Sequence, residues 1–213
     1  MLDFALTAFV AFLVILDPPG TAVVFAAMTR TVAEPHRRAM AWRATGLAGL
    51  MLLAFALGGE WLLAMLGITL PAFRVAGGAL LFLLATDMVF ARQSGLRSTT
   101  PLEEEEAASR EDITVFPLAF PLIAGPGALT SVVLMMGRAQ GDPAHQMVVL
   151  AVLALVLVIM LAALLGAGRL LRLLGMTGAH VVSRVLGVIL AALAAQFVLD
   201  GLRQSLPGLE GVF

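Results

Sequence analysis

Apolar residues follow one another along this chain in runs of about twenty, and short polar stretches separate the runs. A membrane-spanning helix needs about 20 predominantly apolar residues, so runs of this length predict spans. Two shorter apolar segments, at 60–70 and 169–178, cannot cross a bilayer and are expected to lie at its interface or to cap neighbouring helices. The pattern thus predicts an all-α, polytopic membrane protein with six spans, at 4–28, 39–58, 72–91, 113–137, 146–166 and 180–203.

The composition supports this class and excludes several functions. Hydrophobic residues make up 61% of the chain and charged residues 13%, about half the charged share of a soluble domain. The absence of cysteine excludes disulfides, thiol catalysis and cysteine-ligated metals. No basic stripe with interleaved aromatic residues supports nucleic-acid binding. The first run begins with the acidic residue Asp3, and no basic residue occurs before Arg30. The run is therefore interpreted as a retained span rather than a cleavable signal.

The arginines predict the orientation of the chain in the membrane. Loops at one side hold nine of them, against three at or near the other side, so the first set is expected in the cytoplasm and both termini outside. The nine are Arg30, Arg37, Arg38, Arg43, Arg92, Arg97, Arg110, Arg169 and Arg172, and the three are Arg74, Arg138 and Arg203.

Short motifs recur in the same order in the two halves of the chain. They are LGIT at 66–69 and LGMT at 174–177, RVAG at 74–77 and RVLG at 184–187, and Pro-Gly at 19–20 and 126–127. The predicted domains are therefore two three-helix repeats, 1–92 and 113–213, joined by a polar cytoplasmic linker, 93–112. Because three is odd, the second repeat has to be inverted in the membrane, as in many secondary transporters. A duplication without transport activity would leave the same pattern.

The first span contains a helix-breaking motif near its centre, Asp17-Pro18-Pro19-Gly20-Thr21. Pro18 and Pro19 cannot donate to the carbonyls of residues 14 and 15, and their rings clash with a continuous helix. The span is therefore expected to form two half-helices, the second beginning with free amides from about Gly20.

The fourth span repeats the device with more prolines. Pro117, Pro121 and Pro126 should free the carbonyls of Ile113, Pro117 and Leu122, while Gly125 and Gly127 let the backbone turn. Thr130 and Ser131 follow as polar groups. Because of the inversion, this break should approach the membrane centre from the side opposite to the first.

Two converging half-helix amino ends favour an anion such as a carboxylate. The Asp17 carboxylate and freed carbonyls favour an ammonium group or a small cation, so the sequence predicts a small zwitterion as ligand. Two alternatives stay open: the prolines form structural kinks only, or Asp17 is neutralised by Arg74 or Arg184. The predicted substrate-binding residues are Asp17, Pro18, Pro19, Gly20, Thr21, Gly125, Pro126, Gly127 and Thr130.

A second group of polar residues lies elsewhere in the spans. Arg74 and Arg184 occupy equivalent repeat positions, where each could extend to an interface. Thr86, Asp87 and Gln196 could serve coupling or gating, although polar contacts between helices are the commoner role. Gly77, Gly78 and Gly187 are expected to permit close helix packing. No catalytic constellation, metal site or cofactor motif emerges, so an enzyme is not predicted.

At these motifs the chain resembles the MarC family of multi-pass membrane proteins, which includes the SnatA-type small neutral amino acid transporters. The resemblance covers nearly the whole chain and is carried by residues 16–21, 73–78 with 86–88, 117–130, and 184–196. It implies a prokaryotic inner-membrane location and, for the transporter branch, ion-coupled movement of glycine- or alanine-sized amino acids. Members often carry proline where this chain has Val23 and asparagine where it has Thr21, so substrate choice is in doubt.

The leading hypothesis is therefore a secondary transporter of small neutral amino acids, with a proton or a sodium ion as the coupling ion. The rival hypotheses are an exporter of other small metabolites or drugs and a non-transporting membrane scaffold. The lipid bilayer is the expected partner besides the substrate, and homo-oligomer formation stays open.

Overall fold

The computed structural model describes residues 1–90, 112–139 and 142–205, and every regular element in this part of the chain is helical. The predicted polar linker and the last residues lie outside the described part. Five helical stretches are long and apolar enough to cross a membrane, and a sixth span results when one bent helix pair is counted as a single span. The all-α, polytopic class predicted from the sequence is confirmed.

The first half of the chain forms one broken span and two continuous ones. It consists of α1 (Leu2–Leu16), α2 (Pro18–Met28), α3 (Glu34–Met65) and α4 (Leu70–Phe90). Helix α3 continues to Met65, past residue 58 at which the second span is predicted to end. Glu60 interrupts the apolar run without interrupting the helix, and the chain first turns at Gly67, whose φ is +69°.

The second half has the same order of elements. It consists of the π-helix η1 (Thr114–Ile123), α6 (Pro126–Arg138), α7 (Pro143–Leu165) and α8 (Ala167–Ser205). The pair η1 and α6 is bent by 53°. Asp142 caps α7 by accepting a hydrogen bond from the backbone N–H of Ala144 at 2.8 Å.

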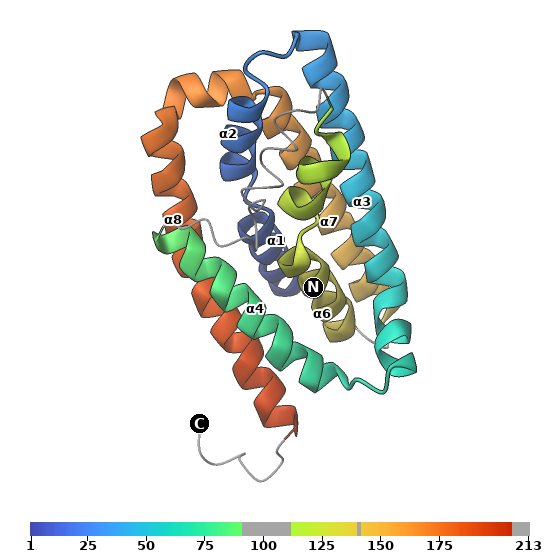
Figure 1. The fold of residues 1–213 in the computed structure, drawn as a ribbon. Coiled ribbons are helices and arrows are strands. Elements are labelled where there is room, and N and C mark those ends of the chain that lie inside the picture. Colours follow the sequence, from blue (N-terminus) through green and yellow to red (C-terminus); the bar gives the residue numbers. More distant parts are fainter. Residues whose placement is uncertain (91–111, 140–141, 206–213) are drawn as a thin grey trace.

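The two broken spans run in opposite directions side by side, with α1 and α2 rising and η1 and α6 descending in the view of Figure 1. Among the unbroken helices, α3 descends and α4 rises in the first half, whereas α7 rises and α8 descends in the second half. This order of directions is the one expected of two inverted halves. The structural equivalence of the halves stays a prediction of the sequence.

Helices α4 and α8 form the most extensive helix pair of the molecule, and glycines permit their close approach. A Cβ on Gly78 would lie 2.8 Å from the carbonyl oxygen of Ala194, and one on Gly187 would lie 3.1 Å from the backbone nitrogen of Val89. The prediction that these glycines serve packing is confirmed. The pair crosses the broken spans on one side, whereas α3 and α7 lie on the other (Figure 1).

Candidate functional site

The first break is centred on Asp17, which ends α1 and begins α2. Its backbone is left-handed, with φ 46° and ψ 66°, and its N–H still donates to the carbonyl of Leu13 at 3.0 Å. Aspartate tolerates this conformation better than most residues do. One carboxylate oxygen accepts the N–H of Gly20 at 3.1 Å, so Asp17 caps the second half-helix. The predicted break in the first span is confirmed.

Thr21 compensates for the change in backbone hydrogen bonding at this break. In a continuous helix the N–H of Gly20 would donate to the carbonyl of Leu16, but here it donates to Asp17. The Thr21 hydroxyl donates to the Leu16 carbonyl instead, at 3.1 Å. Thr21 is therefore part of the break, as the sequence predicts, through its side chain as well as its backbone.

Ser183 of α8 is a contact of this site that the sequence reasoning missed. Its hydroxyl donates to the second carboxylate oxygen of Asp17 at 3.0 Å, and only 2% of Asp17 is exposed. A Cβ on Gly20 would lie 2.2 Å from Asp17 and 2.8 Å from Ser183, which explains the glycine. The one available signal was that Ser183 is the only hydroxyl residue between Thr177 and Ser205.

The second break differs from its prediction in its hydrogen bonds. The carbonyl of Ile113, expected to be free, accepts the N–H of Leu118 at 3.2 Å, and that of Ala119 accepts the N–H of Ala124 at 2.9 Å. Both bonds join residues five apart, which is the π-helical register. With Phe116 and Phe120 in extended conformations, this register lets Leu118, the residue after Pro117, donate to the carbonyl that the proline cannot serve.

Helix α6 begins beyond this break at Pro126, and no side chain caps its amino end. The preceding Gly125 is extended, and a Cβ there would lie 2.4 Å from the carbonyl oxygen of Pro121. The first amides of α6, those of Gly127 and Ala128, have no carbonyl of a preceding helical turn to receive them, whereas that of Leu129 donates to Gly125 at 3.0 Å. This end therefore carries the positive pole of a helix dipole without an acidic side chain.

A small cavity lies at the second break, against Ile15 near the end of α1. Its walls come from the end of α1, from α4 and from the second break, and are Ile15, Leu84, Pro121, Leu122, Ile123, Gly125, Gly127 and Ala128. The space open to the centre of a water molecule is about 10 Å³, which is room for about one water. The cavity in this conformation is therefore too small for an amino acid.

Several predicted binding residues lie beside this cavity rather than in its wall. The Asp17 carboxylate is engaged by Gly20 and Ser183. Thr130 is buried, and its methyl group is so close to α4 that a Cβ on Gly77 would lie 2.0 Å from it. Of the second break, Gly125 and Gly127 line the cavity, whereas Pro126 does not.

A polar cluster lies at the far end of α8, and we call Arg74, Arg138, Gln196, Asp200 and Gln204 the α8 end cluster. Arg138 forms an ion pair with Asp200 at 2.6 Å, and Asp200 also accepts from Gln196 at 2.7 Å. Arg74 donates to Gln204 at 2.7 Å. Arg74 is 6% exposed, and its Nε is buried without a hydrogen-bond partner in the described structure; that it extends to an interface stays a prediction.

The other predicted coupling residues do not converge on the breaks. Arg184 is exposed on α8, and the ion pairs among described residues join neither it nor Arg74 to Asp17. The Thr86 hydroxyl donates to the carbonyls of Phe82 and Leu83 in its own helix. Asp87 is half-buried near the end of α4.

Comparison with known proteins agrees with this architecture. The sequence model of the MarC family, described as integral membrane proteins, matches residues 2–206. The chain is 34% identical over 209 residues to a UPF0056 membrane protein of Archaeoglobus fulgidus, covering 98% of this chain and 97% of the relative. It is 38% identical over 205 residues to a UPF0056 membrane protein of Methanocaldococcus jannaschii, covering 96% and 98%. It is 34% identical over 209 residues to the UPF0056 inner membrane protein YhgN of Escherichia coli, covering 95% and 98%. No solved structure matches the chain.

Proposed function

Because this chain belongs to the MarC family of integral membrane proteins, we propose that it is a secondary transporter of small neutral amino acids of the size of glycine or alanine. One observation supports the proposal above all: two proline-interrupted spans of opposite direction break beside the same cavity. Discontinuous helices that meet near the membrane centre form the substrate sites of many secondary transporters. The proposed location is a prokaryotic inner membrane, the location that the name of the Escherichia coli relative gives for that protein.

The two charges of an amino acid would be bound by different groups. The uncapped amino end of α6, at Gly125 to Ala128, would receive the carboxylate. Asp17 would receive the ammonium group, or would carry the coupling proton or sodium ion while Thr21 and the backbone at the first break hold the substrate. Both roles require Asp17 to exchange its contact with Ser183 for one with the ligand.

Enlargement of the small cavity would have to move α4, which contributes Leu84 to its wall, away from the broken spans, and with it the tightly packed α8. Among the described residues, polar contacts join α8 to the broken spans: the Ser183 hydroxyl with Asp17 in the first, and Asp200 with Arg138 in the second. The extensive α4–α8 packing favours movement of these two helices as one body. Alternating access would then consist of rocking this pair against the two broken spans.

The rival functions are less well supported by the site. A drug exporter would need a large cavity with aromatic walls, whereas the residues that line this cavity are aliphatic, proline or glycine. A scaffold needs no cavity, and Asp17 would then serve only as a helix cap. Transport measurements separate these alternatives.

The test uses purified protein in liposomes with labelled glycine, alanine and leucine outside. We expect uptake of glycine and alanine, but little of leucine, when an inward proton or sodium gradient is imposed. Asp17→Asn should abolish uptake while the protein stays folded, because asparagine also caps helices well. Thr7→Ala is the matched control, since this exposed hydroxyl of α1 bonds only to the carbonyl of Asp3 in its own helix.

Three results would contradict the proposal. Wild-type protein that moves none of the three amino acids under either gradient would exclude amino acid transport. Wild-type uptake retained in Asp17→Asn would remove Asp17 from the mechanism. Preferential uptake of leucine would favour a broader exporter.

A further inference from the structure

The first eight residues of α8 form a separate short helix that lies across one end of the molecule (Figure 1). The bend that ends it is at Gly175, with φ 63° and ψ 176°. Only glycine adopts this conformation readily, so the direction change is built into the sequence. The span proper begins at about Thr177 and runs to Ser205.

The faces of this crosswise helix, residues 167–174, differ in chemistry. Leu170 and Leu171 pack against the hydrophobic core and fix its position. Arg169 and Arg172 are exposed, and Leu173 is 84% exposed, more than any other large apolar side chain in the described part of the chain. Cationic side chains beside an exposed leucine are the pattern of a helix that lies in a membrane interface.

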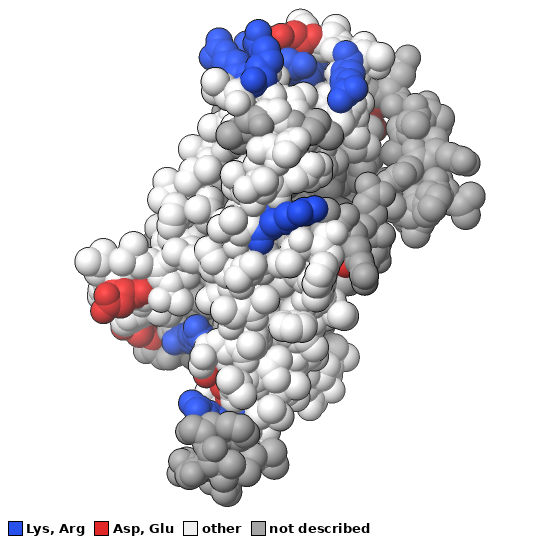
Figure 2. Space-filling model, turned by 90° about the vertical axis from the view of Figure 1, so that its left-hand side faces the viewer, with Lys and Arg blue, Asp and Glu red and all other residues white. Residues whose placement is uncertain are grey.

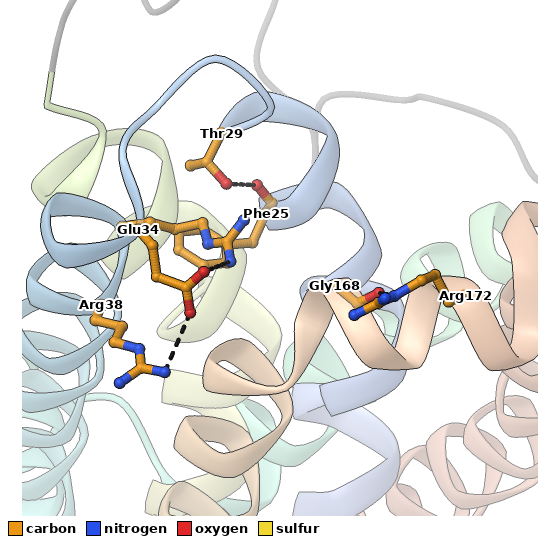
Figure 3. Close-up of polar contacts among 7 residues, drawn as sticks. Phe25, Thr29, Glu34, Arg38, Gly168 and Arg172 are labelled. Carbon is orange, nitrogen blue, oxygen red and sulfur yellow. Dashed lines mark hydrogen bonds and ion pairs between the residues drawn. The ribbon is translucent and has the colours of Figure 1, made fainter.

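Further arginines lie at the same end of the molecule. Figure 2 shows basic side chains gathered over this end. Figure 3 shows Glu34 and Arg38 of α3 on one side of the last turn of α2, with Arg172 of α8 on the other side. Residues 29–38 and 167–174 together contain five arginines and one acidic residue.

That single acid leaves most of the positive charge available. Glu34 pairs with both Arg37, at 3.4 Å, and Arg38, at 3.1 Å. Arg172 is exposed and donates through its Nε to the carbonyl of Gly168 at 3.2 Å, and its two terminal nitrogens make no hydrogen bond with the described residues. Guanidinium groups bind phosphate oxygens in pairs of hydrogen bonds.

We propose that this end is a binding surface for anionic phospholipid headgroups, with the crosswise helix lying in the interface. Arg169 and Arg172, supported by Arg30, Arg37 and Arg38, bind lipid phosphates, and Leu173 inserts among the acyl chains. The exposed leucine is the reason to name a lipid rather than a soluble phosphate, because a soluble anion gives an apolar side chain nothing to contact. The proposal does not depend on transport.

The test is native mass spectrometry of the full chain released from neutral detergent, after incubation with phosphatidylglycerol or phosphatidylcholine. We expect several phosphatidylglycerol molecules to be retained at concentrations where phosphatidylcholine is lost. The double variant Arg169→Gln/Arg172→Gln should weaken retention roughly 30-fold, which corresponds to about 1 kcal/mol for each arginine at an anionic surface. Leu173→Gln should weaken it as well, without changing net charge.

Arg203→Gln is the matched control, since it removes an exposed arginine from the other end of the same helix. It should leave phosphatidylglycerol retention unchanged. Equal retention of the two lipids by wild-type protein would overturn the proposal, as would equal losses in Arg203→Gln and in the double variant. Displacement of phosphatidylglycerol by millimolar inorganic phosphate would show a site for soluble anions and would overturn the lipid assignment. If the double variant does not fold, the wild-type comparison and Leu173→Gln decide.

Discussion

Asp17 combines two structural tasks that the sequence suggests only in part. Its carboxylate caps α2 through the N–H of Gly20 and binds the hydroxyl of Ser183. A buried charge in a membrane span costs about 2.5–3.5 kcal/mol on insertion scales. Two hydrogen bonds from protein groups offset part of that cost, so the residue has a structural reason to be present beside any role in transport.

The structural task predicts a difference between two substitutions at Asp17. Alanine removes the cap and leaves a backbone N–H and a hydroxyl without their acceptor, so Asp17→Ala should lower the free energy of unfolding by roughly 1–3 kcal/mol. Asn keeps a side-chain oxygen and tolerates left-handed backbone, so Asp17→Asn should cost about 1 kcal/mol or less. Unfolding in mixed micelles measures both. Equal stability of the two variants would contradict the capping role.

The residues of the first break could be predicted because proline acts locally. Two consecutive prolines cannot continue a helix in any tertiary setting, so the break followed from residues 17–21 alone. The contact of Ser183 with Asp17 could not be predicted in the same way. It depends on which face of α8 packs against the break, and Ser183 lies 166 residues away in sequence.

At the scale of whole helices, the number of spans could be predicted but not their exact ends. Hydropathy marks where a helix leaves hydrocarbon and not where its hydrogen bonding stops, which is why α3 continues through Glu60. The π-helical register of η1 was also missed. Proline spacing shows that donors are absent, but the replacement donor at Leu118 depends on the packed backbone path.

The close approach of α4 and α8 predicts the effect of adding one methyl group. Gly78→Ala would place its Cβ 2.8 Å from the backbone oxygen of Ala194, and a backbone atom yields less easily than the tip of a side chain. We expect a loss of about 1–3 kcal/mol in the free energy of unfolding. Gly46→Ala in α3 is the control, because a Cβ at that position would have nothing within 4 Å of it.

The control should be neutral or more stable by up to about 1 kcal/mol, since alanine is the better helix former. Thermal unfolding of both variants in the same detergent makes the comparison. If Gly78→Ala were as stable as Gly46→Ala, the α4–α8 contact would be looser than described.

At the scale of the whole molecule, the small cavity and the polar links of α8 would represent one end state of the proposed transport cycle. Hydropathy and the repeat predict which spans are broken and that they run in opposite directions. They do not predict how small the cavity is, because Ile15, Leu84 and Leu122 fill it through contacts between distant segments. Sequence periodicity carries no information on such volumes.

Opening of the molecule can be followed because the chain has no cysteine. Ala128 lines the cavity and is 4% exposed, so Ala128→Cys should react slowly with a small methanethiosulfonate reagent at rest. Under an ion gradient with glycine the reaction should accelerate severalfold, because the cavity has to open during turnover. Ala44→Cys is the control, since Ala44 is fully buried in α3 and does not line the cavity.

Equal reactivity of the two cysteines with and without substrate would contradict opening at this cavity. Acceleration at both positions would indicate general loosening of the bundle rather than a defined movement.

The small size of the cavity also bears on the energy economy of a cell that makes this protein. A space of about 10 Å³ admits about one water and no hydrated ion. Under the proposed function, an idle copy in this conformation should therefore dissipate neither the proton-motive force nor the sodium-motive force. Vesicles that contain many copies should hold an imposed voltage as long as empty vesicles do, until a substrate is added.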